Sequence, residues 1–285
     1  MKIVLSGANG YIAQNLIREL KVSNHEIVTI GRNELYDIPD LTEKISGSDV
    51  VIHLAGAPIL CRWTKTNKAE ILKSRTESTR NIIRVINQIP ETKRPQTFIS
   101  ASAIGIYAPG IPHSEESALF SDDFVGKVVR QWEHSSVELT GSIRKIIFRI
   151  GLVLGREAKT MRQLLPVFKL GLGGRLGSGK QPFPFVHIDD VARAFLWAIQ
   201  NPESSGIYNL VAPQNITNAQ FTKDLSKILH RPALFSVPEF VLKIVYGEAS
   251  SLLLQSPVVD PERLLNSGFK FNYPDIQSCL TEIIQ

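Results

Sequence analysis

The sequence predicts an α/β protein with a doubly wound parallel sheet and a smaller, mostly helical C-terminal lobe. Over the first 150 residues, short apolar segments of strand length alternate with segments of helix length. This alternation is typical of a parallel sheet with helices on both faces. Beyond residue 151 it gives way to a cluster of glycines and then to short helical patterns separated by prolines.

The first strand runs directly into a glycine turn. Residues 3–13 read Ile-Val-Leu-Ser-Gly-Ala-Asn-Gly-Tyr-Ile-Ala, the order of a strand that feeds a helix N-terminus able to hold a dinucleotide pyrophosphate. Gly7 permits the tight turn, Gly10 lets the backbone approach the phosphates, and Ala13 allows close packing of helix on strand. The fold is therefore predicted to be of the Rossmann type. The cofactor contacts expected here are Gly7, Asn9, Gly10, Tyr11 and Ile12.

The second strand, residues 26–30, ends in Gly31-Arg32-Asn33. The position just past this strand normally faces the adenosine ribose, where an acid binds the 2′-hydroxyl and an arginine accommodates a 2′-phosphate. Arg32 therefore favours NADP over NAD. The alternative is a solvated arginine in a β-to-α loop.

The third strand, residues 49–54, closes in Ala55-Gly56-Ala57. Small residues at the carboxyl end of a strand allow a flat ring to lie close to the backbone, so Leu54, Ala55 and Gly56 are expected cofactor contacts. A helix from about residue 68 to 87 follows, with apolar residues at helical spacing. Arg75 on this helix either contacts the cofactor or substrate, or is an exposed helical arginine.

The loop after the third strand carries Arg62 and Trp63, which we assign to the substrate side of the site. Trp63 can stack on a ring or pack beneath the loop. Trp132 is expected in the core, and Gly151 is counted among the cofactor contacts. The remaining elements of this half are a strand at 97–101, a loop rich in turn formers at 108–121, a helix from near 122 toward 139 and a strand at 145–150.

The second half begins with five glycines between residues 171 and 179, interleaved with Arg175 and followed by Lys180. A flexible basic loop suits an anionic substrate, although such loops also occur without function. His187 is expected to hydrogen-bond locally beside a helix that Asp189 caps. The predicted domains are a cofactor-binding domain of residues 1–151 plus 183–210 and a substrate-side lobe of residues 152–182 plus 211–285.

The composition is that of a globular protein that binds a small molecule. Hydrophobic residues make up 43% and charged residues 21% of the 285, and the net charge of +5 is spread along the chain, which argues against a nucleic-acid partner. Two cysteines are too few for a metal cluster or a disulfide framework. No apolar stretch approaches the roughly 20 residues of a membrane span. We expect no metal, no membrane partner, a cytoplasmic location and a monomer or homodimer.

Several motifs resemble those of the extended short-chain dehydrogenase/reductases, more narrowly an epimerase subgroup related to nucleoside-diphosphate-sugar epimerases. The broader motifs are Ser6–Ala13, His53–Gly56, Ser100–Ala103 with Tyr107, and His187–Arg193. The subgroup motifs are Ala57–Ile59 with Arg62-Trp63, Lys73–Arg75, Phe124–Glu133, Gly171–Gly174 with Gly177–Gly179, and Arg231-Pro232 through Gly247–Ser250. Together they span almost the whole chain.

The resemblance implies a catalytic Tyr, a Lys that lowers the pKa of that Tyr, and a Ser that hydrogen-bonds the same substrate oxygen. The Tyr and Lys should lie four residues apart near residue 122, but the chain has Phe124 and Lys127, three apart. Ser102 occupies the position of the family's serine, and Tyr107 matches a tyrosine that lines the site. Ser102 and Tyr107 are therefore expected to carry the chemistry, and Lys127 to hydrogen-bond the nicotinamide ribose.

Two functions follow from these residues. One is an NADP-dependent oxidoreductase or epimerase-like enzyme acting on a polar, sugar-nucleotide-like substrate. The other is a non-catalytic NADP-binding sensor or regulatory protein. The missing Tyr favours the second, whereas Ser102, the glycine-rich basic loop and the full C-terminal lobe favour the first.

Overall fold

The computed structural model describes residues 1–285, and its centre is a six-stranded, all-parallel sheet. The strand order is β10-β6-β4-β3-β1-β2, which reverses direction between β1 and β3. Ligands of open α/β sheets bind at the carboxyl ends of the strands at such a reversal. The strands are β1 (Lys2–Ser6), β2 (Glu26–Ile30), β3 (Val50–His53), β4 (Thr97–Ala103), β6 (Arg144–Ile150) and β10 (Gly206–Leu210).

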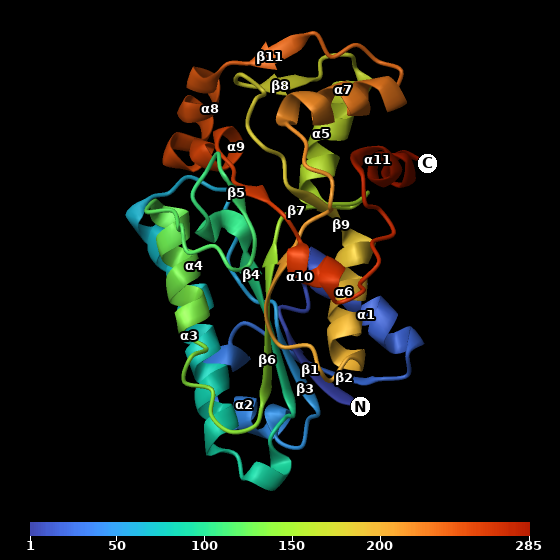
Figure 1. Ribbon diagram of the computed structural model, residues 1–285. Coiled ribbons are helices and arrows are strands. Elements are labelled where there is room, and N and C mark those ends of the chain that lie inside the picture. Colours follow the sequence, from blue (N-terminus) through green and yellow to red (C-terminus); the bar gives the residue numbers. More distant parts are fainter.

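Helices cover both faces of this sheet (Figure 1). On one face lie α1 (Tyr11–Val22) and α6 (Ile188–Gln200); on the other lie α2 (Ile38–Ile45), α3 (Lys65–Gln88) and α4 (Phe124–His134). The strands are apolar on both sides for this reason. In β1, Ile3 and Leu5 pack in the core beneath α1 and α6, whereas Val4 packs in the core beneath α2 and α3. The predicted fold class is confirmed.

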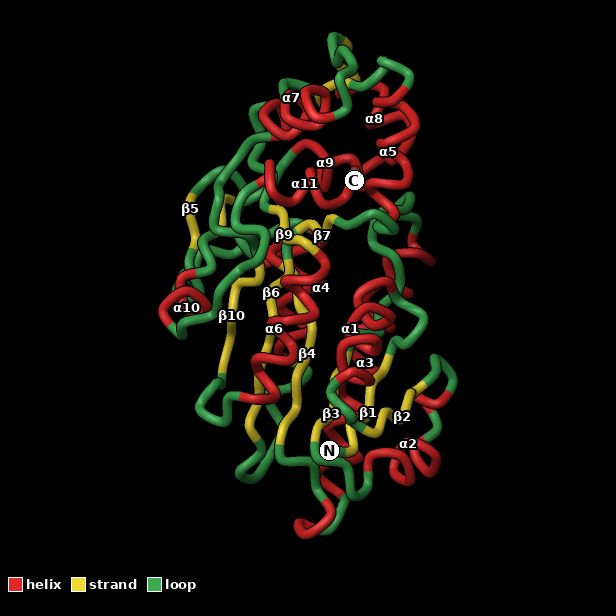
Figure 2. Tube along the Cα trace, turned by 90° about the vertical axis from the view of Figure 1, so that its right-hand side faces the viewer, coloured by secondary structure: helices red, strands yellow, loops and turns green.

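The C-terminal lobe sits over the carboxyl end of the sheet (Figure 2). Its own core gathers apolar side chains from α5, α7 and α11, among them Phe168, Phe221 and Leu280. Its helices are α5 (Lys159–Lys169), α7 (Asn218–Ile228), α8 (Glu239–Tyr246), α9 (Ser251–Leu254) and α11 (Ile276–Ile284), whereas α10 (Glu262–Asn266) lies beside the sheet. Its short parallel pairs are β7 (Leu152–Leu154) with β9 (Phe185–His187), β8 (Gly174–Leu176) with β11 (Phe235–Val237), and β5 (Pro112–His113) with β12 (Val258–Val259).

Some details differ from the expectations. Of the segment expected to return to the sheet from residue 183, residues 185–187 pair with β7 instead, and the chain rejoins the main sheet only at β10. The helix expected to run toward residue 139 ends at His134, where a turn at Ser135 and Ser136 replaces it. Within the last segment, α10 packs against β10, and its Leu264 belongs to the core of the sheet. The domain boundaries remain a prediction.

The start of α6 corrects one local expectation. His187, not Asp189, is the N-cap, since its Nδ1 accepts the N–H of Asp189 at 3.3 Å. Nε2 of His187 lies 2.8 Å from the Glu282 carboxylate on α11. His187 is 1% exposed, so it joins two helices as a buried structural residue. No helix in the protein combines the length and apolar character needed to span a bilayer.

Candidate cofactor and substrate site

The glycine turn between β1 and α1 presents free backbone donors. Gly7 has φ of 79°, and a Cβ there would lie 2.8 Å from the backbone nitrogen of Ala55. Position 7 therefore requires glycine, because a side chain there would clash with the backbone that follows β3. No hydrogen bond involves the N–H groups of Tyr11, Ile12 or Ala13, and no acid lies in the first turn of α1. Such a helix start can bind a phosphate.

A buried histidine joins the elements beneath this turn. His53 Nδ1 lies 2.6 Å from Ser6 Oγ, and its Nε2 lies 3.1 Å from Ser78 Oγ on α3. Burial, with a smaller contribution from the charge of Arg75, lowers the pKa of His53 to about 3. His53 is therefore neutral and fully buried, and it holds β1, β3 and α3 together.

Arg75 is a half-buried cation with no acidic partner. Its guanidinium carbon would lie 3.2 Å from a Cβ on Gly56 and is 5.3 Å from the centre of the Trp132 ring. Of its nitrogens, only Nη1 donates, to the carbonyl of Ile71 at 3.0 Å. Burial lowers the pKa of Arg75 to about 10. Arg75 is thus not an exposed helical arginine, and it can pair with an anion that arrives at the sheet edge.

Two further residues predicted to contact the cofactor are Arg32, which follows β2, and Tyr11, which begins α1. The Arg32 side chain is 74% exposed, and its nearest acid, Glu70, is 3.9 Å away, a surface pair too weak to hold it. The Tyr11 hydroxyl lies beside Gly155, because a Cβ there would fall within 2.1 Å of it. Burial, then the charges of Asp189 and Glu157, raise the pKa of Tyr11 to about 12, so its phenol stays protonated.

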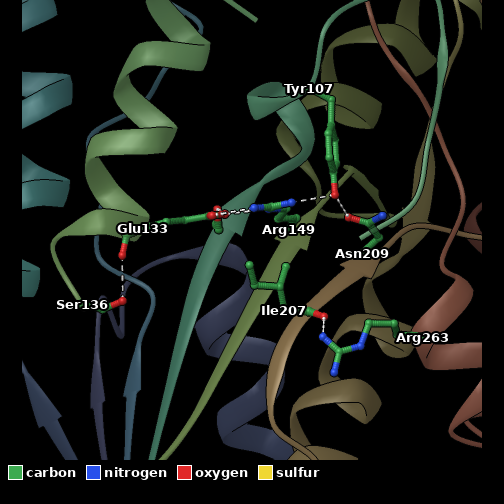
Figure 3. Close-up of polar contacts among 8 residues, drawn as sticks. Tyr107, Glu133, Ser136, Arg149, Ile207, Asn209 and Arg263 are labelled. Atoms are coloured by element: carbon green, nitrogen blue, oxygen red, sulfur yellow. Dashed lines mark hydrogen bonds and ion pairs between the residues drawn. The ribbon is translucent and has the colours of Figure 1, made fainter. Parts of the chain in front are cut away.

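Ser102 and Tyr107 take part in one buried polar network, of which Figure 3 labels Tyr107, Glu133, Arg149 and Asn209. Ser102 donates to Glu133 Oε1 at 2.5 Å. Arg149 donates to both oxygens of Glu133, at 2.8 and 2.7 Å, and to the Tyr107 hydroxyl at 2.8 Å. Tyr107 in turn donates to Asn209 Oδ1 at 2.8 Å. Ser102 is 4% and Tyr107 1% exposed, so the protein itself occupies both hydroxyls.

Sequence reasoning missed Glu133 and Arg149. The one signal was a charged residue inside the apolar strand Ile146-Ile-Phe-Arg-Ile150. Because side chains alternate along a strand, Arg149 and Ser102 lie on the same face of the sheet, in register as neighbours on β6 and β4. Burial raises the pKa of Tyr107, so its phenol stays protonated and is not available as a base.

The start of α4 is apolar where the resemblance implies a phenol and an amine. Phe124 packs on Trp63, with ring centres 4.9 Å apart. Val128, one helical turn on, is 2% exposed. Lys127 is exposed and makes no side-chain contact to a polar group, so the structure does not bring it to the other site residues.

The remaining residues predicted to bind the cofactor or the substrate do not form one cluster. Trp63 donates from Nε1 to the carbonyl of Ile59 at 2.9 Å and supports its loop. Arg62 is exposed and donates to the carbonyl of Ile244 on α8 at 3.2 Å. Gly151 is packed tightly, since a Cβ there would lie 2.6 Å from the Pro184 oxygen. Lys180 lines a cavity in the C-terminal lobe that Arg175 does not line.

Sequence models of known families match most of the chain. Residues 3–211 match the NAD dependent epimerase/dehydratase family, and residues 237–283 match a domain of unknown function, DUF1731. The epimerase family protein SDR39U1 of Bos taurus is 34% identical, with all of both chains covered. The epimerase family protein YfhF of Bacillus subtilis is 32% identical, over 100% of this chain and 98% of the relative.

Two solved structures are similar over the whole chain. The human epimerase family protein SDR39U1 (isoform 2) with NADPH has a TM-score of 0.92 and 31% identity, over 99% of each chain. A nucleoside-diphosphate sugar epimerase from Corynebacterium glutamicum has a TM-score of 0.79 and 27% identity. That match covers 100% of this chain and 58% of the other.

Proposed function

The chain belongs to the NAD-dependent epimerase/dehydratase family, and on that premise we propose that it binds NADP(H) and transfers hydride between the cofactor and a small polar substrate. The observation that carries this proposal is the glycine turn. There the first three N–H groups of α1 make no hydrogen bond, and no acidic residue lies in the first turn of that helix. The similar human structure is described with NADPH, which supports the choice of cofactor.

The carboxyl end of the sheet offers hydrogen-bond donors and cations that can bind the phosphate groups of the cofactor. The N–H groups at the start of α1, with Asn9 and Gly10, would hold the pyrophosphate. The carboxyl end of β3, from Leu54 to Gly56, offers small residues against which a flat ring can lie. Arg32 would pair with the 2′-phosphate, and Arg75 is a partly buried cation of this sheet edge that has no counterion.

NADP(H), when bound, supplies or accepts the hydride; the protein's residues position the reactants and balance charge. Phe124 and Val128 cannot transfer a proton, and the hydroxyls of Ser102 and Tyr107 already donate to Glu133 and Asn209. We therefore assign Ser102 and Tyr107 as positioning residues at the end of β4. Arg75 is assigned the role of stabilising negative charge on the ligand. Arg62 and Trp63 would border the substrate.

A second candidate is a protein that binds NADP(H) as a sensor without turnover. The apolar start of α4 and the occupied hydroxyls favour it. The retained C-terminal lobe, which holds its own cavity, favours the enzyme.

Replacing Arg32 with Ala is expected to weaken NADPH binding by roughly ten- to a hundredfold and leave NADH binding unchanged. The reason is the loss of charge-assisted hydrogen bonds to the 2′-phosphate, worth about 1.5–3 kcal/mol. Calorimetric titration of both cofactors measures it. The matched control is Arg84→Ala, an exposed arginine of α3 without polar contacts. Equal loss in both variants, or equal affinity of the wild type for NADPH and NADH, would overturn the assignment of Arg32.

Turnover separates the enzyme from the sensor. NADPH oxidation is measured across a panel of carbonyl and sugar-nucleotide compounds. For a substrate that reacts, Ser102→Ala and Tyr107→Phe are expected to lower kcat while NADPH affinity and the pH profile of kcat/KM stay unchanged, because both residues act through position. A changed pH profile would instead make one of them a proton donor. Tight NADPH binding with no turnover in the whole panel would support the sensor.

A further inference from the structure

A charged pair adjoins the turn that carries Arg32. Glu34 lies four residues after the end of β2, and its Oε2 accepts the N–H of Gly31 at 2.5 Å. The Nζ of Lys44, in the last turn of α2, lies 2.7 Å from the same oxygen. Because α2 lies beside β2 (Figure 2), the pair is next to the end of the strand that normally faces the adenosine ribose.

The backbone of this turn is fixed from several sides. The N–H of Leu35 donates to the carbonyl of Gly31 at 3.2 Å, and the Leu35 side chain is 3% exposed in the core beneath α2 and α3. The Leu35 carbonyl accepts from Asn81 on α3 at 3.0 Å. These contacts, with the bond from Gly31 to Glu34, set the path of the backbone at Arg32.

Glu34 brings a negative charge to a turn that is proposed to hold a phosphate. The hydrogen bond from Lys44, with the one from Gly31, lowers the pKa of Glu34, so the carboxylate is ionised at neutral pH. An acid after the second strand of a Rossmann fold suits the 2′-hydroxyl of NAD, whereas its charge repels a 2′-phosphate. Without compensation, Glu34 would oppose the preference that Arg32 provides.

Lys44 supplies the compensating charge. Asp40, one turn earlier on α2, has its Oδ2 3.6 Å from the Nζ of Lys44. Two carboxylates and one ammonium leave this group with one negative charge, and without Lys44 it would carry two. The hydrogen bond to Glu34 raises the pKa of Lys44, which therefore stays charged. Lys44 also donates to the carbonyl of Thr29 at 3.4 Å, and its side chain is only 24% exposed, so its position is fixed.

We propose that Glu34 and Lys44 form a pair that sets the preference for NADP(H): Glu34 positions the turn, and Lys44 neutralises Glu34 so that the turn accepts a 2′-phosphate. The inference rests on the proposed binding of NADP(H). Both are positioning residues, because they act on the surroundings of Arg32 and need not touch the cofactor. Lys44 therefore governs the selectivity between NADPH and NADH and not the affinity for the part that the two cofactors share.

The ratio of the dissociation constants of NADH and NADPH, measured by calorimetric titration, tests the pair. Lys44→Met is expected to weaken NADPH binding by about three- to tenfold and to leave NADH binding nearly unchanged, since a 2′-hydroxyl is neutral. Lys44→Arg keeps the charge and should keep the wild-type ratio. Glu34→Gln keeps an amide oxygen for the N–H of Gly31 and should bind NADPH at least as tightly as the wild type.

The double variant separates neutralisation from direct contact. Glu34→Gln combined with Lys44→Met leaves the group with one negative charge, as in the wild type, and should recover the wild-type ratio. Salt separates charge from shape. The difference between the wild type and Lys44→Met should shrink in about 0.5 M KCl, where the Debye length is about 4 Å.

Lys243→Met is the matched control. It breaks an exposed lysine–glutamate ion pair on α8, 3.8 Å from Glu239, and changes the net charge of the chain by the same amount. We expect both affinities to stay at their wild-type values. Urea unfolding of each variant shows whether it is folded. If Lys44→Met does not fold, Glu34→Gln carries the test, because weaker NADPH binding in that variant would contradict repulsion by Glu34.

Four results would contradict this inference: an unchanged ratio in Lys44→Met, an equal loss for NADPH and NADH in that variant, an equal loss in Lys243→Met, or a double variant that binds NADPH as weakly as Lys44→Met. The last would place Lys44 on the phosphate itself. With a wild type that prefers NADPH, any of these results leaves the proposed function standing. A wild type that binds neither cofactor would contradict the proposed function as well.

Discussion

Gly7→Ala is expected to abolish tight NADPH binding and to lower the free energy of unfolding by about 2–5 kcal/mol. A non-glycine residue at a φ of 79° costs about 1–2 kcal/mol. The added Cβ would also meet the backbone of Leu54 and Ala55 at 2.8–2.9 Å, and overpacking of this kind costs about 1–3 kcal/mol. Relief of that clash moves the turn away from β3 and misaligns the free N–H groups. Urea unfolding and NADPH titration measure the two effects.

Gly268→Ala is the matched control for this variant. Gly268 also has a φ of 79°, but a Cβ there would meet nothing within 4 Å. We expect it to lose only the backbone contribution of about 1–2 kcal/mol and to bind NADPH like the wild type. An equal loss of stability and equal NADPH binding in the two variants would contradict this explanation. Glycine at position 7 would then not be required by the close approach of β1 to β3.

Arg149→Met is expected to lower the free energy of unfolding by about 3–5 kcal/mol. The side chains of Arg149 and Glu133 are 3% and 13% exposed and meet at 2.7 Å. Burial opposes the charge of Arg149, but the hydrogen bonds and attraction of Glu133 outweigh it and raise the pKa of the guanidinium. Removing the cation leaves the buried Glu133 carboxylate with Ser102 as its remaining donor and removes the hydrogen bond from Arg149 to the Tyr107 hydroxyl. Equilibrium unfolding in urea measures the loss.

Two further variants test the cause of that loss. Arg130→Met removes another arginine ion pair, at 3.3 Å from Asp122, whose side chain is 94% exposed, and a hydrogen bond to the carbonyl of Ser121 at 2.8 Å; together these should cost no more than about 1–2 kcal/mol. Arg149→Met combined with Glu133→Leu removes both charges and should recover much of the stability, since an apolar pair replaces an ionic one. A loss in Arg149→Met no larger than in Arg130→Met would contradict the importance of the buried network.

Local sequence determined the half of the molecule that forms the sheet. The strand predicted at residues 26–30 is β2, and the glycine turn joins a strand to a helix as expected. These features depend on neighbouring residues: an apolar run, a residue that tolerates positive φ, and a helix that starts within a few positions. The ligand group that such a turn binds, a phosphate, could be inferred for the same reason.

Only the tertiary structure decided which side chains meet. Ser102 was singled out for a substrate oxygen, but its hydroxyl donates to Glu133, 31 residues away on α4. Lys127 was assigned to the site, but the rotation of α4 turns Val128 inward instead. That rotation is set by which face of the helix buries most apolar surface against β4 and α3. Spacing along the chain does not report it.

The positions of the basic residues were likewise decided by the tertiary structure. The sequence predicted Arg75 as a contact of the cofactor or substrate, and Arg175 and Lys180 as contacts of an anionic substrate. In the fold, Arg75 lies against Gly56 without a counterion, Lys180 lines the cavity, and Arg175 lies on the exposed surface of β8. The sequence by itself determined the sheet, the turn and the cofactor class, because those depend on local backbone chemistry. The tertiary structure decided the positions of charges, because burial and counterions come from segments distant in the chain.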